Sequence, residues 1–309
     1  MFALHYARFG DADVLSVGPL PEPHAGPGEI RIRVVAAGVS PVDVALRTGL
    51  TPAASRIVLP HVPGVDAAGV VDEVGSGVTD VFVGDEVFGS VDIARLGGAS
   101  AEFAVLSLWA RRPQSMSWEE SGSAGTSIET ATRVLDLLDV GEGTTLLIDG
   151  AAGGVGSVAV QLAIARGARV VGTGRAESRE FLAGLGADPV VYGPGLVERV
   201  SALALGPIDR ALDIAGAGSL PELITLTGSA SAVVTIADFS ARALGVRLSM
   251  GEMGGEAGGR YGLAVAAALA EEGRFRVPVR AVFPLGRGAE AHVTTGRGPR
   301  HGKVALRVS

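Results

Sequence analysis

Three glycines directly after a short apolar run constrain this chain most. The run is Thr145 to Asp149, and Gly150, Gly153 and Gly156 follow it as G-x-x-G-x-x-G. A continuous apolar run of this length is typical of a buried parallel strand. At a strand-to-helix turn, these glycines allow the tight turn, the close approach of a pyrophosphate and the packing of the helix. The spacing therefore predicts a dinucleotide site formed by Gly150, Gly153, Gly154, Val155 and Gly156. The alternative is a glycine-rich turn with no ligand.

Strands and helices alternate along the chain after residue 144. We expect further strands at 168–173, 189–192, 208–214 and 232–236, with helices at 155–166 and 178–185. Such alternation is typical of βαβ units, whose strands form a doubly wound parallel sheet. The predicted fold class is α/β, with a Rossmann sheet as one domain.

The first 120 residues have a different texture. Residues 29–35 alternate apolar and charged side chains, as a half-buried strand does, and short glycine-punctuated strands are expected at 68–75 and 81–89. Helices are expected from Trp118, over 130–138 and over 261–272. Residues 277–309 return to short strands, which we expect to pack on the N-terminal domain. The predicted domains are 1–121, a β-rich catalytic domain; 122–257, the Rossmann domain; and 258–309, which returns to the first.

Composition excludes several classes of protein. The net charge is −7 over 309 residues and no basic stripe is visible, which argues against binding of nucleic acid. The chain has no cysteine, so disulfides and thiolate metal sites are excluded. The N-terminal residues do not resemble a signal peptide, and no segment looks like a membrane span. We expect a cytoplasmic protein.

The end of the second Rossmann strand decides between the two nicotinamide cofactors. An NAD site has an Asp or Glu there that binds the ribose hydroxyls, whereas this chain has Thr173-Gly174-Arg175. An arginine pairs with a 2′-phosphate, so NADPH is predicted. Glu177 keeps NADH as the alternative, and a solvated surface side chain is the alternative for Arg175. Tyr192, after the third strand, either lines the adenine side or caps the sheet.

With these motifs in order, the chain resembles the medium-chain dehydrogenase/reductase superfamily, in its zinc-free quinone oxidoreductase (zeta-crystallin-like) branch. The similar segments cover nearly the whole chain: residues 26–43, 59–75, 83–89, 150–162 and 302–306. The resemblance implies a GroES-like catalytic domain beside the Rossmann domain.

The chain departs from the zinc-dependent relatives at their metal ligands. Ser40 stands where they have a cysteine, Val65-Asp66 where they have a His-Glu pair, and Ala124 near a further cysteine. Because a catalytic zinc normally has three protein ligands, no metal is expected.

The resemblance also implies contacts with cofactor and substrate. Ser40 and Asp43 match positions near the nicotinamide, with Ser40 as a polar contact and Asp43 either catalytic or a brace for the turn. The tyrosine that some relatives place soon afterwards as a proton donor is absent here, so water is the alternative donor. Further cofactor contacts are implied at Thr130, Ala215, Gly216, Ile236 and Ala237, with Ser127 near the nicotinamide. Arg300 and Lys303 either reach the cofactor or are surface charges.

The predicted activity is hydride transfer from NADPH to a small quinone or α,β-unsaturated carbonyl. The alternative within the class is an enoyl-thioester or polyketide-tailoring reductase. The alternative of another class is an NADPH-binding sensor or structural protein with little catalysis. The resemblance implies a homodimer joined by Rossmann sheet edges, with 232–236 or 245–249 as the edge.

Overall fold

The computed structural model describes residues 1–203, 206–297 and 301–309, so Arg300 lies outside the described residues. The chain divides into two compact units. One unit holds residues 1–126 and 263–309, and the other holds residues 127–262. The sequence placed these divisions at 121 and 257.

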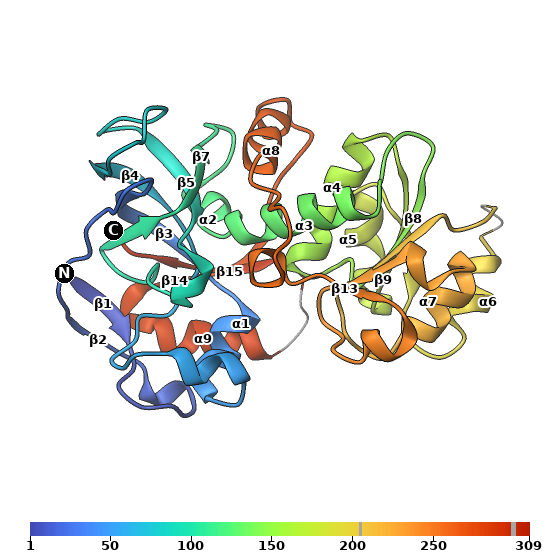
Figure 1. Cartoon of the computed structure of the whole chain (residues 1–309), viewed down its shortest axis with the longest axis horizontal. Helices are drawn as coiled ribbons and strands as arrows, with labels where there is room; N and C mark the ends of the chain where they lie inside the picture. The colour runs from blue at the N-terminus through green and yellow to red at the C-terminus, as the bar shows by residue number, and fades with distance from the viewer. Residues whose placement is uncertain (204–205, 298–300) are drawn as a thin grey trace. The chain divides into compact units, whose positions relative to one another are not determined.

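The 127–262 unit is built on one parallel sheet of six strands, in the order β10-β9-β8-β11-β12-β13. Figure 1 labels β8, β9 and β13 of this sheet. The strands are β8 Thr145–Asp149, β9 Arg169–Gly174, β10 Asp188–Val191, β11 Arg210–Asp213, β12 Val233–Thr235 and β13 Arg247–Leu248. Strand order reverses between β8 and β11, as in the Rossmann fold, where ligands bind at this point. The predicted doubly wound parallel sheet is confirmed.

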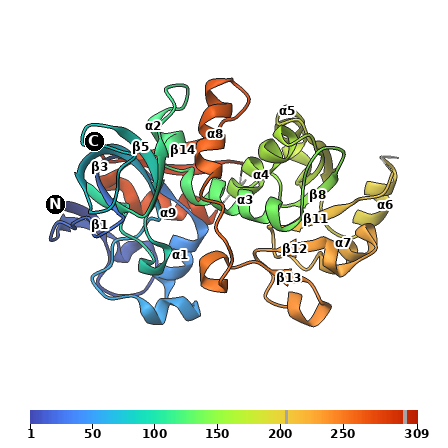
Figure 2. The ribbon, with the colours of Figure 1, turned by 45° about the horizontal axis from the view of Figure 1, so that its top comes forward.

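Helices connect these strands. α4 packs against β8 and β9, and α7 packs against β11 and β12 (Figure 2). The helices are α3 Gly125–Leu137, α4 Gly154–Ala165, α5 Arg179–Gly184, α6 Leu196–Ser201 and α7 Leu220–Thr227. Short 3-10 turns lie at Ala176–Ser178, Ala230–Ala232, Ala241–Leu244 and Gly251–Gly254. Leu147, Val171, Ala211 and Val233 are buried on neighbouring strands, which explains their continuous apolar sequence.

The other unit is built on a mainly antiparallel sheet in the order β14-β15-β3-β4-β5-β7, with β6 also pairing with β3. The strands are β3 Ile30–Val39, β4 Asp66–Val74, β5 Glu86–Ser90, β6 Phe103–Leu106, β7 Leu108–Arg111, β14 Val279–Pro284 and β15 Lys303–Arg307. A separate antiparallel pair is formed by β1 Phe2–His5 and β2 Ser16–Pro19. The helices are α1 Pro41–Thr48, α2 Trp118–Ser121, α8 Gly262–Glu271 and α9 Gly288–Gly296, with 3-10 turns at Ala12–Val14, Pro52–Arg56, Ile93–Arg95 and Leu285–Arg287.

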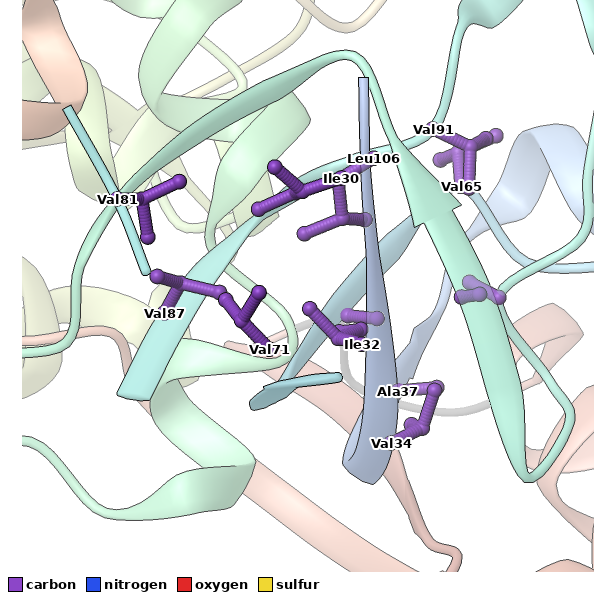
Figure 3. Packing of buried hydrophobic residues seen from close by; sticks show 13 residues of the cluster. Ile30, Ile32, Val34, Ala37, Val65, Val71, Val81, Val87, Val91 and Leu106 are labelled. Atoms are coloured by element: carbon purple, nitrogen blue, oxygen red, sulfur yellow. The ribbon is translucent and has the colours of Figure 1, made fainter. Parts of the chain in front are cut away.

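The core of this second sheet comes from alternate residues of its strands. Ile30, Ile32 and Val34 of β3 are buried in one apolar cluster with Val71 and Val87 (Figure 3). The alternation of residues 29–35 arises from this burial, because successive side chains of a strand point to opposite faces. The expected return of the C-terminal segment is also observed, since β15 pairs with β3.

Two sequence predictions are wrong in part. The strand expected over 81–89 begins only at Glu86, because Phe82 to Asp85 form a turn in which the Phe82 N–H donates to the Asp85 carboxylate at 2.9 Å. The C-terminal tail contains a helix, α9, as well as strands. Its glycine and β-branched residues are poor helix formers, and burial of Ala291, His292 and Thr295 stabilises it.

Among the described residues, no helix combines the length and the apolar character that crossing a membrane requires.

Candidate cofactor and substrate site

The glycine loop joins β8 to α4, and its backbone admits no larger residue at two positions. Gly150 has φ +86°, which favours glycine. A Cβ on Gly156 would lie 2.3 Å from the Gly150 carbonyl oxygen. A Cβ on Gly153 would meet nothing closer than 3.4 Å. Gly150 and Gly156 therefore shape the loop, whereas the position of Gly153 leaves room for a ligand.

The loop presents the N-terminus of α4 to solvent. Gly153 is the N-cap residue, and Gly154 and Val155, in the first turn, are only partly buried. The first N–H groups of a helix have no partner inside the helix, and the helix dipole makes this end positive. The residues present therefore fit the pyrophosphate of a dinucleotide.

Basic side chains surround the end of β9. A hollow of about 270 Å³ is lined by Arg175, which follows β9, and by Arg179 and Arg199 from the helices beyond it. Arg199 donates to the carbonyl oxygens of residues 191, 193 and 194. Arg175 and Arg179 are exposed and have no ion-pair partner within residues 1–203, 206–297 and 301–309. The guanidinium groups of Arg175 and Arg179 are suitable donors for a phosphate.

Arg179 was not singled out from the sequence, although it lies four residues after Arg175, one helical turn away. Glu177, the acid for which NADH remains the alternative cofactor, lies between them in the sequence and is exposed. Tyr192 follows β10 and is 48% exposed, and its N–H donates to the Gly174 carbonyl oxygen at 3.2 Å.

The other predicted contacts gather at the same edge of the sheet. Ala215 and Gly216 follow β11 and are exposed, and Ile236 and Ala237 follow β12 and are partly buried. Thr173 differs, since its side chain is completely buried and its hydroxyl bonds beneath the glycine loop. These predicted residues therefore lie together at the carboxyl ends of the strands, whereas the Thr173 side chain lies below the loop.

Ser40 and Asp43 form a tight unit at the start of α1. Ser40 is the N-cap residue, and its hydroxyl and N–H both donate to the Asp43 carboxylate at 2.7 Å. The Gly64 N–H donates to the other carboxylate oxygen at 3.1 Å. Burial raises the pKa of Asp43 to about 6, against the opposing effect of these hydrogen bonds. The geometry is that of a capping box, in which Asp43 braces the turn.

Lys303 and Thr130 are also engaged within the protein. The Lys303 ammonium lies 3.5 Å from the buried Asp66 carboxylate, which also accepts from the Thr126 N–H at 2.6 Å. The Thr130 hydroxyl contacts Glu129 at 3.2 Å and Arg133 at 3.5 Å. Ser127 is buried.

The residues at the zinc-ligand positions do not fit a metal site. The Asp66 carboxylate forms an ion pair with Lys303 and accepts a hydrogen bond from Thr126. Ser40 donates a hydrogen bond to Asp43, and Ala124 is a buried apolar residue. Within the part of the chain that the structure describes, no three His, Cys, Asp or Glu side chains are grouped for metal binding.

A larger hollow of about 720 Å³ lies beside β13, lined among others by Arg133, Arg247, Asp136 and Tyr261. Its charges are paired with each other or with neighbours. Arg133 and Arg247 bond Glu256, and Asp136 accepts from the Tyr261 hydroxyl. It shares no residue with the glycine loop.

Comparison with known proteins agrees with this geometry. A model described as "Alcohol dehydrogenase GroES-like domain" matches residues 26–109, and one described as "Zinc-binding dehydrogenase" matches residues 154–247. The solved structure of the quinone oxidoreductase from Coxiella burnetii is similar with a TM-score of 0.83 and 26% identity, covering 100% of this chain and 99% of that chain.

Two curated plant enzymes are similar in sequence. The 2-methylene-furan-3-one reductase of Solanum lycopersicum is 36% identical over 198 residues, which are 61% of this chain and 51% of that protein. The chloroplastic NADPH-dependent alkenal/one oxidoreductase of Arabidopsis thaliana is 32% identical over 246 residues, which are 74% of this chain and 63% of that protein. The matched region thus spans about half of the first relative and 63% of the second.

The two domain matches and the whole-chain structural similarity lead to one assignment. The chain belongs to the medium-chain dehydrogenase/reductase superfamily, in its quinone oxidoreductase branch.

Proposed function

We propose that this protein is an NADPH-dependent, zinc-independent reductase of small quinones or α,β-unsaturated carbonyl compounds. The observation that carries the proposal is the end of β9, where Arg175 and Arg179 line one hollow and Gly174-Arg175 stands in place of the acid that an NAD site has. The plant relative named for NADPH and for alkenal/one reduction supports the same cofactor and substrate class.

Different residues of the chain bind different parts of NADPH. The α4 N-terminus and the glycine loop would hold the pyrophosphate, and Arg175 and Arg179 would hold the 2′-phosphate. Residues 215–216 and 236–237 would line the nicotinamide side. The bound cofactor supplies a hydride. An enone or quinone is already electrophilic, so orientation by the protein contributes much of the rate.

The acceptor oxygen gains negative charge during the reaction and needs a hydrogen-bond donor or a proton. The Ser40 hydroxyl has one hydrogen, and in this structure it donates that hydrogen in a hydrogen bond to the Asp43 carboxylate. Ser40 therefore becomes a donor to substrate only by releasing Asp43. We propose that Ser40 is a polar contact and that solvent water supplies the proton.

The test is the oxidation of NADPH and of NADH, followed at 340 nm with a benzoquinone, a naphthoquinone, an alkyl enone and an enoyl thioester. Turnover of a quinone or the enone with NADPH, unaffected by a zinc chelator, is the expected result. Exclusive turnover of the thioester would instead establish an enoyl-thioester reductase. Tight binding of NADPH without turnover of any acceptor would contradict the proposed activity and favour a sensor or structural role.

We propose two further properties of the protein, its oligomeric state and its location. The protein is a homodimer joined through β13, because β13 is the edge strand of the parallel sheet whereas β12 is internal. Its location is the cytoplasm, which cell fractionation with an antibody to the native protein would test.

A further inference from the structure

Two buried aspartates lie side by side at the carboxyl ends of neighbouring strands. Asp149 ends β8, Asp213 ends β11, and the two residues are partners in the register of these strands. They are 2% and 0% exposed. Burial raises the pKa of Asp213, the hydrogen bonds from Gly216 and Thr235 oppose the rise, and Asp149 adds to it. This is the point where strand order reverses.

The first aspartate bonds to a threonine on the next strand, and that threonine holds the glycine loop. The Thr173 hydroxyl donates to Asp149 Oδ1. The same hydroxyl oxygen accepts the Gly150 N–H at 3.1 Å. Asp149 Oδ2 accepts from the Ser219 hydroxyl, just before α7, at 2.6 Å.

The second aspartate repeats the arrangement. The Thr235 hydroxyl of β12 donates to Asp213 Oδ2 at 2.7 Å, and its oxygen accepts the N–H groups of Ala237 at 3.1 Å and Asp238 at 3.0 Å. Asp213 Oδ1 accepts the N–H groups of residues 215 and 216 at 3.0 and 2.9 Å. The first pair therefore holds the loop after β8, through the bond of Thr173 to Gly150. The second pair holds the loop after β12 through Thr235 and the loop after β11 through Asp213.

The direction of these bonds fixes the threonine rotamers. An ionised carboxylate only accepts hydrogen bonds, so each threonine must point its O–H at the aspartate. Because the hydrogen of each hydroxyl is used in this way, the threonine oxygen can only accept, and it accepts from N–H groups of the loops. Valine has nearly the same shape but no hydroxyl, so it is not an equivalent residue in a core. At either position it would leave the loop N–H groups and the buried carboxylate without this partner. What the hydroxyls add is the position of the loop backbone.

We propose that Thr173 and Thr235 are positioning residues for the dinucleotide, acting through Gly150 on the pyrophosphate side and through Ala237 and Asp238 on the nicotinamide side. The inference rests on the proposed function, since it takes NADPH as the ligand of these loops. It assigns Thr173 a place below the loop and adds Thr235, Asp149 and Asp213 as the residues that hold the loops in place.

The experiment compares Thr173→Val, Thr173→Ser, Thr235→Val and Thr235→Ser with the wild type. The Kd for NADPH is measured by fluorescence, kcat and KM by turnover, and the thermal midpoint without cofactor. Thr225→Val is the matched control, because the Thr225 hydroxyl is exposed on α7 and donates only to a helix carbonyl. We expect each valine variant at 173 or 235 to raise the Kd at least about tenfold, with serine restoring it.

The expected split between kinetic constants differs for the two residues. Thr173→Val raises the KM for NADPH with little change in kcat, whereas Thr235→Val also lowers kcat, because it supports the nicotinamide side. A loss of fold alone would lower the thermal midpoint without this split, and the serine variants, which keep the hydroxyl, remain as a test if a valine variant does not fold.

Two results would overturn the inference alone: valine variants that bind NADPH as the wild type does, or serine variants as weak as the valine variants. Failure of the wild type to bind NADPH would overturn the proposed function and this inference together.

Discussion

At the scale of single residues, Arg175 and Arg179 are expected to determine the choice between NADPH and NADH. Charge-assisted bonds to a phosphate contribute about 1.5–3 kcal/mol each, so Arg175→Ala and Arg179→Ala should each raise the KM for NADPH roughly 10- to 100-fold. The KM for NADH, which lacks the 2′-phosphate, should change little. Steady-state kinetics with both cofactors measure this, with the exposed Arg242→Ala as control. Equal effects on both cofactors would contradict the assignment.

His292 is a buried residue whose titration should affect stability. Burial lowers its pKa to about 4, with a further contribution from the charge of Arg47. Because the folded pKa lies below the unfolded value, the unfolded state binds more protons, and stability falls as pH drops from about 6.5 to about 4. The full loss is about 3 kcal/mol. Denaturant unfolding across this range should show a shallower pH slope for His292→Gln, whereas Thr225→Val, which changes an exposed residue without a titrating group, should keep the wild-type slope.

Single residues were predictable where their role depends on their neighbours in sequence. Arg175 follows its strand directly, so its place could be inferred. The direction of Thr173 could not, because its partners Asp149 and Gly150 lie on another strand and only the sheet register brings them together. The engagement of Lys303 with Asp66 is hidden from the sequence for the same reason.

At the scale of elements, the β8–loop–α4 unit gives the sharpest test. Gly156→Ala places a Cβ 2.3 Å from the Gly150 carbonyl oxygen, so the loop must shift. We expect loss of NADPH binding and destabilisation of about 1–3 kcal/mol. Gly184→Ala in α5 is the matched control, since its Cβ meets nothing within 4 Å. Calorimetry should show that variant unchanged or slightly stabilised, and equal NADPH affinity for both variants would contradict the predicted loop role.

Elements with a clear period or strong end signals were predicted, and those formed by packing were not. The strand at 145–149 was placed at its observed bounds because its apolar run is uninterrupted. α9 was missed because its sequence lacks helical periodicity and its stability comes from packing against α1, β14 and β15. The turn at 82–85 was predicted as strand because it contains the apolar residues Phe82 and Val83. Both are exposed in the structure, so their apolar character does not indicate a buried strand.

At the scale of the whole molecule, the proposed dimer makes a direct prediction. Within the residues that the structure describes, β13 pairs with a strand on one side alone, so its outer backbone groups are available to a second copy. Light scattering should give twice the mass of the chain, and Leu248→Pro, which removes a backbone donor from this edge, should shift the mass toward the monomer. A monomeric wild type at micromolar concentration would contradict the proposal.

The sequence also predicted the two-unit organisation, because the change from β-rich texture to βαβ alternation is visible near residue 118. It could not predict which hollow lies beside which edge, since that depends on contacts such as those of Arg133 and Glu256.

The place of β15 between β14 and β3 has a consequence for biosynthesis. Residues 127–262 form one uninterrupted stretch, so this unit can fold while the ribosome is still translating the chain. The other unit has to wait, because β3 obtains one neighbour only when residues 303–307 have been made. A nascent chain arrested after residue 270 and exposed from the ribosome should therefore resist protease over 127–262 and be cut within the first 126 residues.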